Sequence, residues 1–228
     1  MEEKRPLLLL VHGWALGPGL WRPLRHHLPG WRTHSLNLGF FGELDTTLPQ
    51  EPWIGLGHSL GYLWLLSRLA DPAIARYSQG LVSIGGFSCF HRQQDFPHGV
   101  PPRLLERMRT RLQEDPLQVI SDFAARSGVH PPLPAAGLQP HLQHLDQGLA
   151  LLQEHDARSL QKDWATRCLA LASRDDPIVS PDMSRECFPD TILRWSDTGG
   201  HLLPLTRPAW CAGMLTPFLT AREERDVR

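Results

Sequence analysis

Apolar runs alternate with mixed segments along the chain, and this alternation predicts a series of strands and helices. Stretches of strand length occur at residues 6–11, 31–38, 53–56, 80–85, 166–172 and 191–195. Continuous apolar runs such as PLLLLV and GLVSIG are typical of strands buried on both faces of a parallel sheet. Helical patterns occur at about residues 20–28, 60–69 and 208–219. We therefore predict an α/β fold with a mostly parallel central sheet and helices on both faces.

Residues 89–164 interrupt this alternation and contain no convincing strand pattern. Apolar side chains recur there at helical spacing in two groups, which are Leu104, Met108 and Leu112, and then Leu142, Leu145, Leu149 and Leu152. We predict that this segment is an all-helical insertion late in the sheet, placed over the strand ends as a lid. Residues 1–88 and 165–221 then form the core, and residues 222–228 form a charged tail.

The crossover between the second and third strands is unusually short. Only fourteen residues separate Leu38 from Trp53, and residues 40–49 have little helical pattern. Parallel strands are usually joined by a helix. We expect that helix to be missing here, so that one face of the sheet is less covered or is covered by the lid or a partner.

Composition narrows the class of protein. The chain has 228 residues, of which 41% are hydrophobic and 21% charged, and its net charge is −1. This balance fits one globular domain and gives no global attraction to nucleic acid or anionic membranes. The apolar run at residues 7–11 is too short to span a bilayer, and His12 and Gly13 end it too early for a signal peptide. We expect a cytoplasmic monomer.

The four cysteines, Cys89, Cys168, Cys187 and Cys211, show no CxxC spacing. We interpret them as reduced and mostly buried thiols, with a structural disulfide as the alternative.

The sequence GLGHSLG at residues 55–61 follows the third predicted strand. Gly-x-Ser-x-Gly at a strand-to-helix junction is typical of a nucleophilic serine on a tight turn. Ser59 is therefore the candidate nucleophile. The alternative is a helix-start serine without chemistry, and partners in the right order along the chain decide between the two.

A serine nucleophile needs a base, and the base needs a carboxylate that orients it. Asp175 and Asp176 follow the fifth predicted strand, and His201 follows the sixth, after two glycines. We favour Asp176 as the acid because it directly precedes Pro-Ile-Val, and we keep Asp175 as the alternative. The order Ser59, Asp176, His201 is that of the α/β-hydrolases.

Two backbone N–H groups are needed to hold the developing oxyanion. We expect them from Leu60, which follows the nucleophile, and from Trp14, in the loop after the first strand. Trp14 also belongs to the expected apolar pocket, with Phe87, Phe90, Phe123 and Leu60. His12 is expected to hydrogen-bond the oxyanion loop and His58 to shape the turn. The histidines form no metal-ligand cluster in the sequence, so we expect no metal.

Four motifs spread over the sheet, LLLLVHGW, GLGHSLG, SRDDPIVS and TGGH, resemble the α/β-hydrolase superfamily. Residues 12–24, 87–123 and 148–160 narrow the resemblance to the pimeloyl-[acyl-carrier protein] methyl ester esterases of biotin synthesis. That resemblance implies catalysis by Ser59, Asp176 and His201, an oxyanion held by the Trp14 and Leu60 amides, and no cofactor. The implied reaction removes the methyl ester from a pimeloyl chain held on acyl-carrier protein. The missing helix departs from the family's pattern and leaves the substrate open.

Arg103, Arg107 and Arg111 recur every four residues and form one stripe of a predicted lid helix, with Leu104, Met108 and Leu112 expected on its opposite side. Acyl-carrier proteins are acidic, so this stripe is a candidate docking surface. The alternative is a solvated helix face, with Glu106 and Glu114 balancing part of the charge.

Two other functions stay open beside the carrier-specific esterase. One is a general short-chain ester or thioester hydrolase with the same triad. The other is a non-catalytic binding module on a hydrolase scaffold.

Overall fold

The computed structural model describes residues 5–128 and 139–223 of the chain. Six parallel strands form one sheet in the order β2-β1-β3-β4-β5-β6. The strands are β1 (Leu7–Val11), β2 (Thr33–Leu36), β3 (Trp53–His58), β4 (Ser78–Ile84), β5 (Cys168–Ser173) and β6 (Ile192–Ser196). Each predicted strand is present, so the prediction of a parallel α/β sheet is confirmed.

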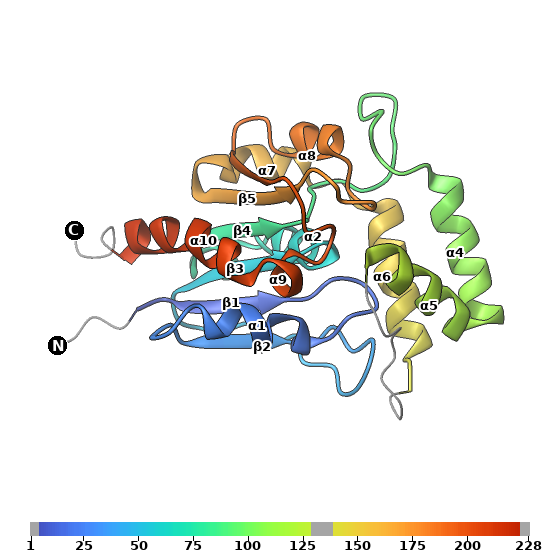
Figure 1. Cartoon of the computed structure of the whole chain (residues 1–228), viewed down its shortest axis with the longest axis horizontal. Coiled ribbons are helices and arrows are strands. Elements are labelled where there is room, and N and C mark those ends of the chain that lie inside the picture. Colours follow the sequence, from blue (N-terminus) through green and yellow to red (C-terminus); the bar gives the residue numbers. More distant parts are fainter. Residues whose placement is uncertain (1–4, 129–138, 224–228) are drawn as a thin grey trace.

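Helices cover both faces of this sheet (Figure 1). The described helices of the core are α1 (Arg22–His26), α2 (Leu60–Arg68), α3 (Pro72–Ala75), α8 (Pro181–Cys187), α9 (Leu203–Thr206) and α10 (Pro208–Glu223), with the 3-10 turns η1 (Pro18–Trp21) and η2 (Ala165–Arg167). Side chains alternate along β1, so that Leu9 packs with α2 on one face and Leu10 packs with α1, α9 and α10 on the other. This two-sided burial explains the continuous apolar runs of the strands.

Between β4 and β5 the described residues form four helices in place of a single crossover helix. They are α4 (Pro102–Glu114), α5 (Pro116–Ser127), α6 (Leu142–Glu154) and α7 (Arg158–Trp164). Figure 1 shows α4, α5 and α6 together beyond the carboxyl ends of the strands, while the start of β1 and the end of α10 lie on the opposite side of the molecule. Residues 129–138 of the predicted lid, and residues 224–228 of the predicted tail, lie outside the described residues. We call residues 89–164 the insertion.

The boundaries differ from the predictions where local geometry ends an element. The second strand is shorter than residues 31–38, because Asn37 leaves the ladder and pairs with Asp45 instead. The first helical segment begins as a 3-10 turn at Pro18, and the last helix continues to Glu223, past the predicted end at 219. No described helix is long and apolar enough to cross a membrane. All four cysteines are free and buried.

The crossover from β2 to β3 contains no helix in residues 37–52, all of which are described. The insertion covers this region instead. The His141 N–H donates to the Phe40 carbonyl at 3.0 Å, and Phe41 pairs with Pro140 in an isolated bridge. Phe40 and Phe41 are buried as a result, which answers the question of what replaces the missing helix.

Candidate active site

Ser59 occupies a tight turn between β3 and α2. Its backbone has φ 53° and ψ −124°, a conformation that non-glycine residues rarely adopt. The two flanking glycines allow the turn, since a Cβ at Gly57 would lie 2.3 Å from the Tyr62 Cα and one at Gly61 would lie 2.2 Å from the Val11 carbonyl oxygen. The turn places the Ser59 hydroxyl at the carboxyl end of the sheet.

His201 follows β6 and reaches back to this turn. Its Nε2 lies 3.0 Å from the Ser59 Oγ, and its Nδ1 lies 2.9 Å from the Asp176 Oδ2. The imidazole is fully buried. With Nδ1–H donating to the carboxylate, Nε2 is free to accept the serine proton, which is the geometry a general base requires.

Asp176 is held in place by its own backbone neighbours. Its Oδ1 accepts hydrogen bonds from the N–H groups of Ile178 at 2.8 Å and Val179 at 3.0 Å, which leaves Oδ2 for His201. The Asp176 side chain is 2% exposed. This arrangement fixes the orientation of the carboxylate.

Asp175, the alternative acid, has a different set of partners. It accepts hydrogen bonds from the backbone N–H groups of Gly199 at 3.2 Å and Gly200 at 2.8 Å, and from the Ser173 hydroxyl. These bonds, the one from Ser173 above all, hold the pKa of Asp175 below its usual value. Asp176 therefore contacts the His201 ring, whereas Asp175 contacts the backbone of the loop that carries His201.

The loop after β1 lies against the Ser59 turn. A Cβ at Gly13 would lie 3.0 Å from the Ser59 Cβ and 2.7 Å from the His58 Nδ1, so only glycine permits this approach. The next residue is Trp14. Leu60 begins α2, so its N–H has no acceptor within the helix. The two expected oxyanion amides thus belong to segments that adjoin Ser59.

His12 fastens this loop to the short crossover. Its Nδ1–H donates to the Gly13 carbonyl at 2.9 Å, and its Nε2 accepts from the Leu38 N–H at 3.1 Å. Burial lowers the pKa of His12 to about 4, so the ring is neutral near pH 7. The expected hydrogen bond between His12 and the loop is present. The second hydrogen bond, from the Leu38 N–H, was not predicted, because no spacing in the sequence indicates it.

His58 has a role beyond shaping the turn. Its Nε2–H donates to the His201 backbone carbonyl at 2.9 Å. Burial, and then the nearby His201 ring, lower the pKa of His58 well below its usual value. The residue before the nucleophile therefore holds the backbone of the candidate base. No sequence pattern indicates this contact, because 143 positions separate the two residues.

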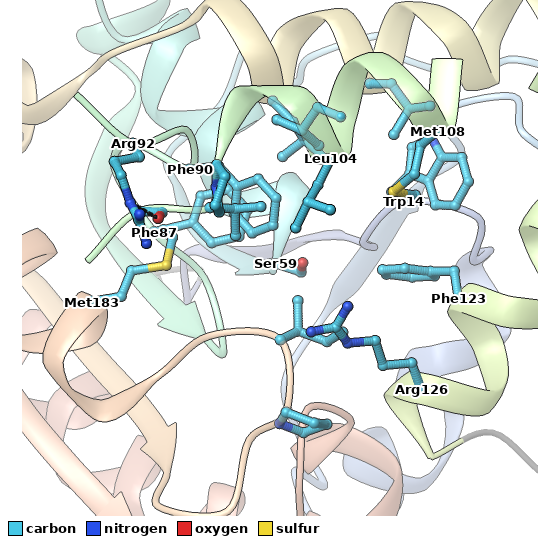
Figure 2. A pocket seen from close by; sticks show the side chains of 18 of the residues that line it. Trp14, Ser59, Phe87, Phe90, Arg92, Leu104, Met108, Phe123, Arg126 and Met183 are labelled. Carbon is cyan, nitrogen blue, oxygen red and sulfur yellow. Dashed lines mark hydrogen bonds between the residues drawn. The ribbon is translucent and has the colours of Figure 1, made fainter. Parts of the chain in front are cut away.

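An apolar cavity of about 550 Å³ opens beside Ser59 and lies mainly between the sheet edge and the insertion. Figure 2 shows Ser59 in the midst of the side chains that line it. Of the five expected pocket residues, Trp14, Phe87, Phe90 and Phe123 line this cavity, whereas Leu60 does not. Further apolar lining comes from Leu104, Leu105, Met108, Val119, Leu149, Leu152, Ile178 and Met183. A space of this shape suits an aliphatic acyl chain.

The arginine stripe of α4 lies differently from the expectation. Arg107 and Arg111 line the cavity together with Leu104 and Met108, and Arg103 does not line it. The predicted opposition of the two stripes is wrong, because neighbouring positions on a helix are about 100° apart rather than opposite. The side of α4 that packs into the core carries Leu105 and Leu112, while Leu104 is 41% exposed.

Two further arginines, Arg92 and Arg126, also line the cavity. Arg111 pairs with Asp122 at 3.6 Å, and both side chains are about half exposed, so the pair is weak. Arg109 instead points to α6, where it donates to both Asp146 oxygens at 2.9 and 3.0 Å and holds the two helices together.

Within residues 5–128 and 139–223, no group of three or more His, Cys, Asp or Glu side chains is placed to hold a metal ion.

Relatives and solved structures resemble the chain along most of its length, although no protein-family model matches it. A pimeloyl-[acyl-carrier protein] methyl ester esterase of Xylella fastidiosa is 29% identical over 94% of this chain and 90% of its own length. The enzyme of that name from Xanthomonas oryzae pv. oryzae is 31% identical over 76% of this chain and 78% of its own length.

Among solved structures, an esterase from Exiguobacterium antarcticum superposes with a TM-score of 0.78 at 14% identity, covering 94% of this chain and 92% of that one. A thermophilic esterase from Thermogutta terrifontis superposes with a TM-score of 0.75 at 16% identity, covering 95% and 90%. These likenesses show the α/β-hydrolase fold. Together with the sequence relatives, they show that the chain belongs to the α/β-hydrolase superfamily, in the family of the pimeloyl-[acyl-carrier protein] methyl ester esterases.

Proposed function

We propose that this protein is a serine carboxylesterase that cleaves the methyl ester of a pimeloyl chain carried by acyl-carrier protein. The observation that carries the proposal is the hydrogen-bonded chain from Ser59 through His201 to Asp176, which opens on an apolar cavity. The relatives' names supply the substrate class. The arginines along the cavity support an acidic carrier as the partner.

The reaction follows from the order of these groups. The Ser59 Oγ attacks the ester carbonyl carbon while its proton passes to the His201 Nε2, and Asp176 stabilises the imidazolium. The oxyanion accepts hydrogen bonds from the Trp14 and Leu60 N–H groups. The tetrahedral intermediate then collapses, and His201 returns the proton to the leaving methoxide, which departs as methanol.

The second half of the reaction repeats these steps with water. His201 removes a proton from a water molecule, whose oxygen attacks the acyl carbonyl, and the free carboxylic acid leaves as Ser59 regains its proton. No cofactor takes part in the proposed mechanism.

The cavity and its arginines support different parts of the substrate. The aromatic and aliphatic lining suits the methylene chain, since each buried methylene contributes about 0.8 kcal/mol. Arg107 and Arg111 line the cavity, and Arg103 lies one turn earlier on α4. We assign these three residues to docking of the acidic carrier. A stripe of positive charge beside the cavity would attract the negatively charged carrier and raise the rate at which it meets the enzyme.

Hydrolysis of methyl-pimeloyl-carrier protein by the purified enzyme tests the proposal directly, with release of methanol and of the free acid as the readout. Rescue of a biotin-requiring strain that lacks its own esterase tests it in cells. A soluble protein that hydrolyses short p-nitrophenyl esters but neither acts on the carrier substrate nor rescues the strain would instead be a general ester or thioester hydrolase.

The third alternative, a binding module without catalysis, is separated by labelling. A fluorophosphonate probe attaches to an activated serine, so modification of Ser59 in the folded protein excludes the binding module. Absence of labelling under conditions that label another serine hydrolase would favour it.

A further inference from the structure

The Trp14 side chain extends from the loop after β1 into the insertion. The indole is 1% exposed, and its Nε1–H donates to the Leu145 carbonyl in α6 at 2.8 Å. The ring also meets Phe123 of α5 edge-on, with centroids 5.0 Å apart. Figure 2 shows Trp14 and Phe123 next to each other on one side of the cavity. One residue thus carries an expected oxyanion amide on its backbone and a contact with two inserted helices on its side chain.

The hydrogen bond to Leu145 is additional to the helix's own bonding. Within α6 the Leu145 carbonyl faces the N–H four residues later, so the helix does not require the indole. The fold also tolerates buried indoles without such a partner, because the Nε1 atoms of Trp21 and Trp53 have none among the described residues. The Trp14 bond is therefore a specific link between loop and helix.

α6 approaches this loop as closely as its side chains allow. A Cβ at Gly148 would lie 2.7 Å from the Trp14 Cδ1 and 3.1 Å from the Phe40 ring. One turn toward the start of α6, the His144 Nδ1 lies 2.8 Å from the Gly39 carbonyl oxygen. Several contacts thus fix the position of the helix against the loop and the short crossover.

On its other side the loop is pressed against the nucleophile. Gly13 leaves no room for a Cβ between itself and Ser59, and Ala15 has a positive φ of 52°. A loop packed between two rigid surfaces follows the movement of either one. A shift of α6 away from the core would therefore displace the Trp14 amide relative to the Ser59 hydroxyl.

We propose that Trp14 is a positioning residue through which α6 holds the oxyanion amide in register with Ser59. The proposal rests on the hydrolase function proposed above and adds a role for Leu145 and Gly148, neither of which touches the reacting atoms. In this arrangement the inserted helix helps to set the rate of the chemical step as well as the shape of the pocket.

Two substitutions test this role. Trp14→Phe removes the indole Nε1–H, and with it the hydrogen bond to Leu145, but keeps an aromatic ring near Phe123. Gly148→Ala keeps the indole but adds a methyl group that pushes α6 away from it. We expect kcat to fall about 10- to 100-fold in each, because small misplacements of a catalytic group cost about that much. Matched controls are Trp164→Phe in α7, and Gly213→Ala in α10, where a Cβ meets nothing within 4 Å.

The pattern of the loss separates positioning from simple packing. An oxyanion defect lowers kcat equally for p-nitrophenyl acetate and butyrate, leaves KM and the pH profile unchanged, and slows fluorophosphonate labelling by the same factor. A defect in the packing of the pocket lining instead raises KM by an amount that depends on the length of the acyl chain. Unchanged kcat in both variants, or a change confined to KM, would overturn the proposal.

Hydrogen exchange supplies a readout that needs no turnover. Amides of residues 12–15 should exchange faster in Gly148→Ala than in Gly213→Ala, and unchanged exchange would count against the proposal.

If the wild-type protein neither hydrolyses esters nor reacts with the fluorophosphonate, the proposed function fails, whereas an active wild type with unaffected variants refutes only the positioning role. Should Trp14→Phe fail to fold, Gly148→Ala carries the same expectations.

Discussion

Asp175 accepts a hydrogen bond from the backbone N–H of Gly200 at 2.8 Å, one residue before His201. Its neighbour Asp176 accepts from the His201 ring at 2.9 Å. Two adjacent carboxylates therefore support the same histidine in different ways, one through the backbone of its loop and the other through its imidazole. This division gives distinct expectations for the two residues.

Asp176→Asn should lower kcat by about 10⁴, because an amide in place of the acid favours the wrong imidazole tautomer in a serine triad. Asp175→Asn should lower kcat far less and should lower the melting temperature, since an amide oxygen accepts the Gly200 N–H more weakly. Steady-state kinetics with p-nitrophenyl butyrate and thermal unfolding measure both effects. A larger kcat loss in Asp175→Asn would reverse the assignment of the acid.

Ser59→Ala should reduce kcat by roughly 10⁴ to 10⁶ while the fold is retained, because the remaining groups cannot form an acyl-enzyme. Fluorophosphonate labelling should disappear with it. Ser67→Ala is the matched control in α2, since that hydroxyl donates to the Trp64 carbonyl of the same helix. Retained labelling in Ser59→Ala would place the nucleophile elsewhere.

Reversal of Arg107 and Arg111 to Glu together should lower kcat/KM for the carrier-bound ester about tenfold or more at low salt. Turnover of a neutral short ester should change much less, and the difference should shrink as salt rises. Steady-state assays of both substrates over a series of salt concentrations measure this difference in kcat/KM.

The control for that experiment is the pair Arg68→Glu and Arg76→Glu. It makes the same change in net charge at the other end of the sheet, because α2 runs away from Ser59 and residue 76 lies just before β4. Equal losses in the two double variants would point to net charge rather than docking. Arg103→Glu then shows how far along α4 the carrier reaches.

His12 should make folding stability depend on pH. Its pKa is about 4 in the folded protein and 6.5 in the reference state, so the unfolded chain binds the proton first as the pH falls. Its contribution is fully present above about pH 6.5 and is progressively lost toward pH 4. The expected loss between pH 8 and pH 5 is about 2 kcal/mol.

Urea unfolding at the two pH values measures this effect. His12→Gln should show a smaller drop between pH 8 and pH 5 than the wild type, and His26→Gln, at an exposed position, should show the same drop as the wild type. An undiminished drop in His12→Gln would assign the pH dependence to other groups, such as His58.

The sequence predicted β1, β3, β4 and β5 well because these central strands are buried on both faces and read as apolar runs. The edge strands β2 and β6 are only partly buried and mix polar with apolar residues. Ser59, Asp176 and His201 were recognisable because Ser59 directly follows β3 and the other two lie in the loops after β5 and β6. Parallel strands bring these positions together at the carboxyl end of the sheet. Contacts made through the backbone leave no pattern in the residue types. The hydrogen bond that the Gly200 N–H donates to Asp175, and the one that His58 donates to the His201 carbonyl, were therefore beyond prediction.

The wrong prediction of which side of α4 faces the core has another reason. Four-residue spacing identifies a stripe on a helix but does not say which stripe faces the core, and α4 carries apolar side chains on two neighbouring stripes. Packing against α6, through Leu105, Leu112 and the Arg109–Asp146 pair, decides which is buried. That information lies in a helix more than thirty positions away.

The helix absent between β2 and β3 makes the insertion part of the core. Phe40 and Phe41 would face solvent without α6 and the residues that lead into it, and the loop behind Ser59 would lose one of its two supports. Trimming the chain to its sheet and flanking helices would thus produce an aggregation-prone fragment rather than a smaller hydrolase. Sheet and insertion should melt in one cooperative transition.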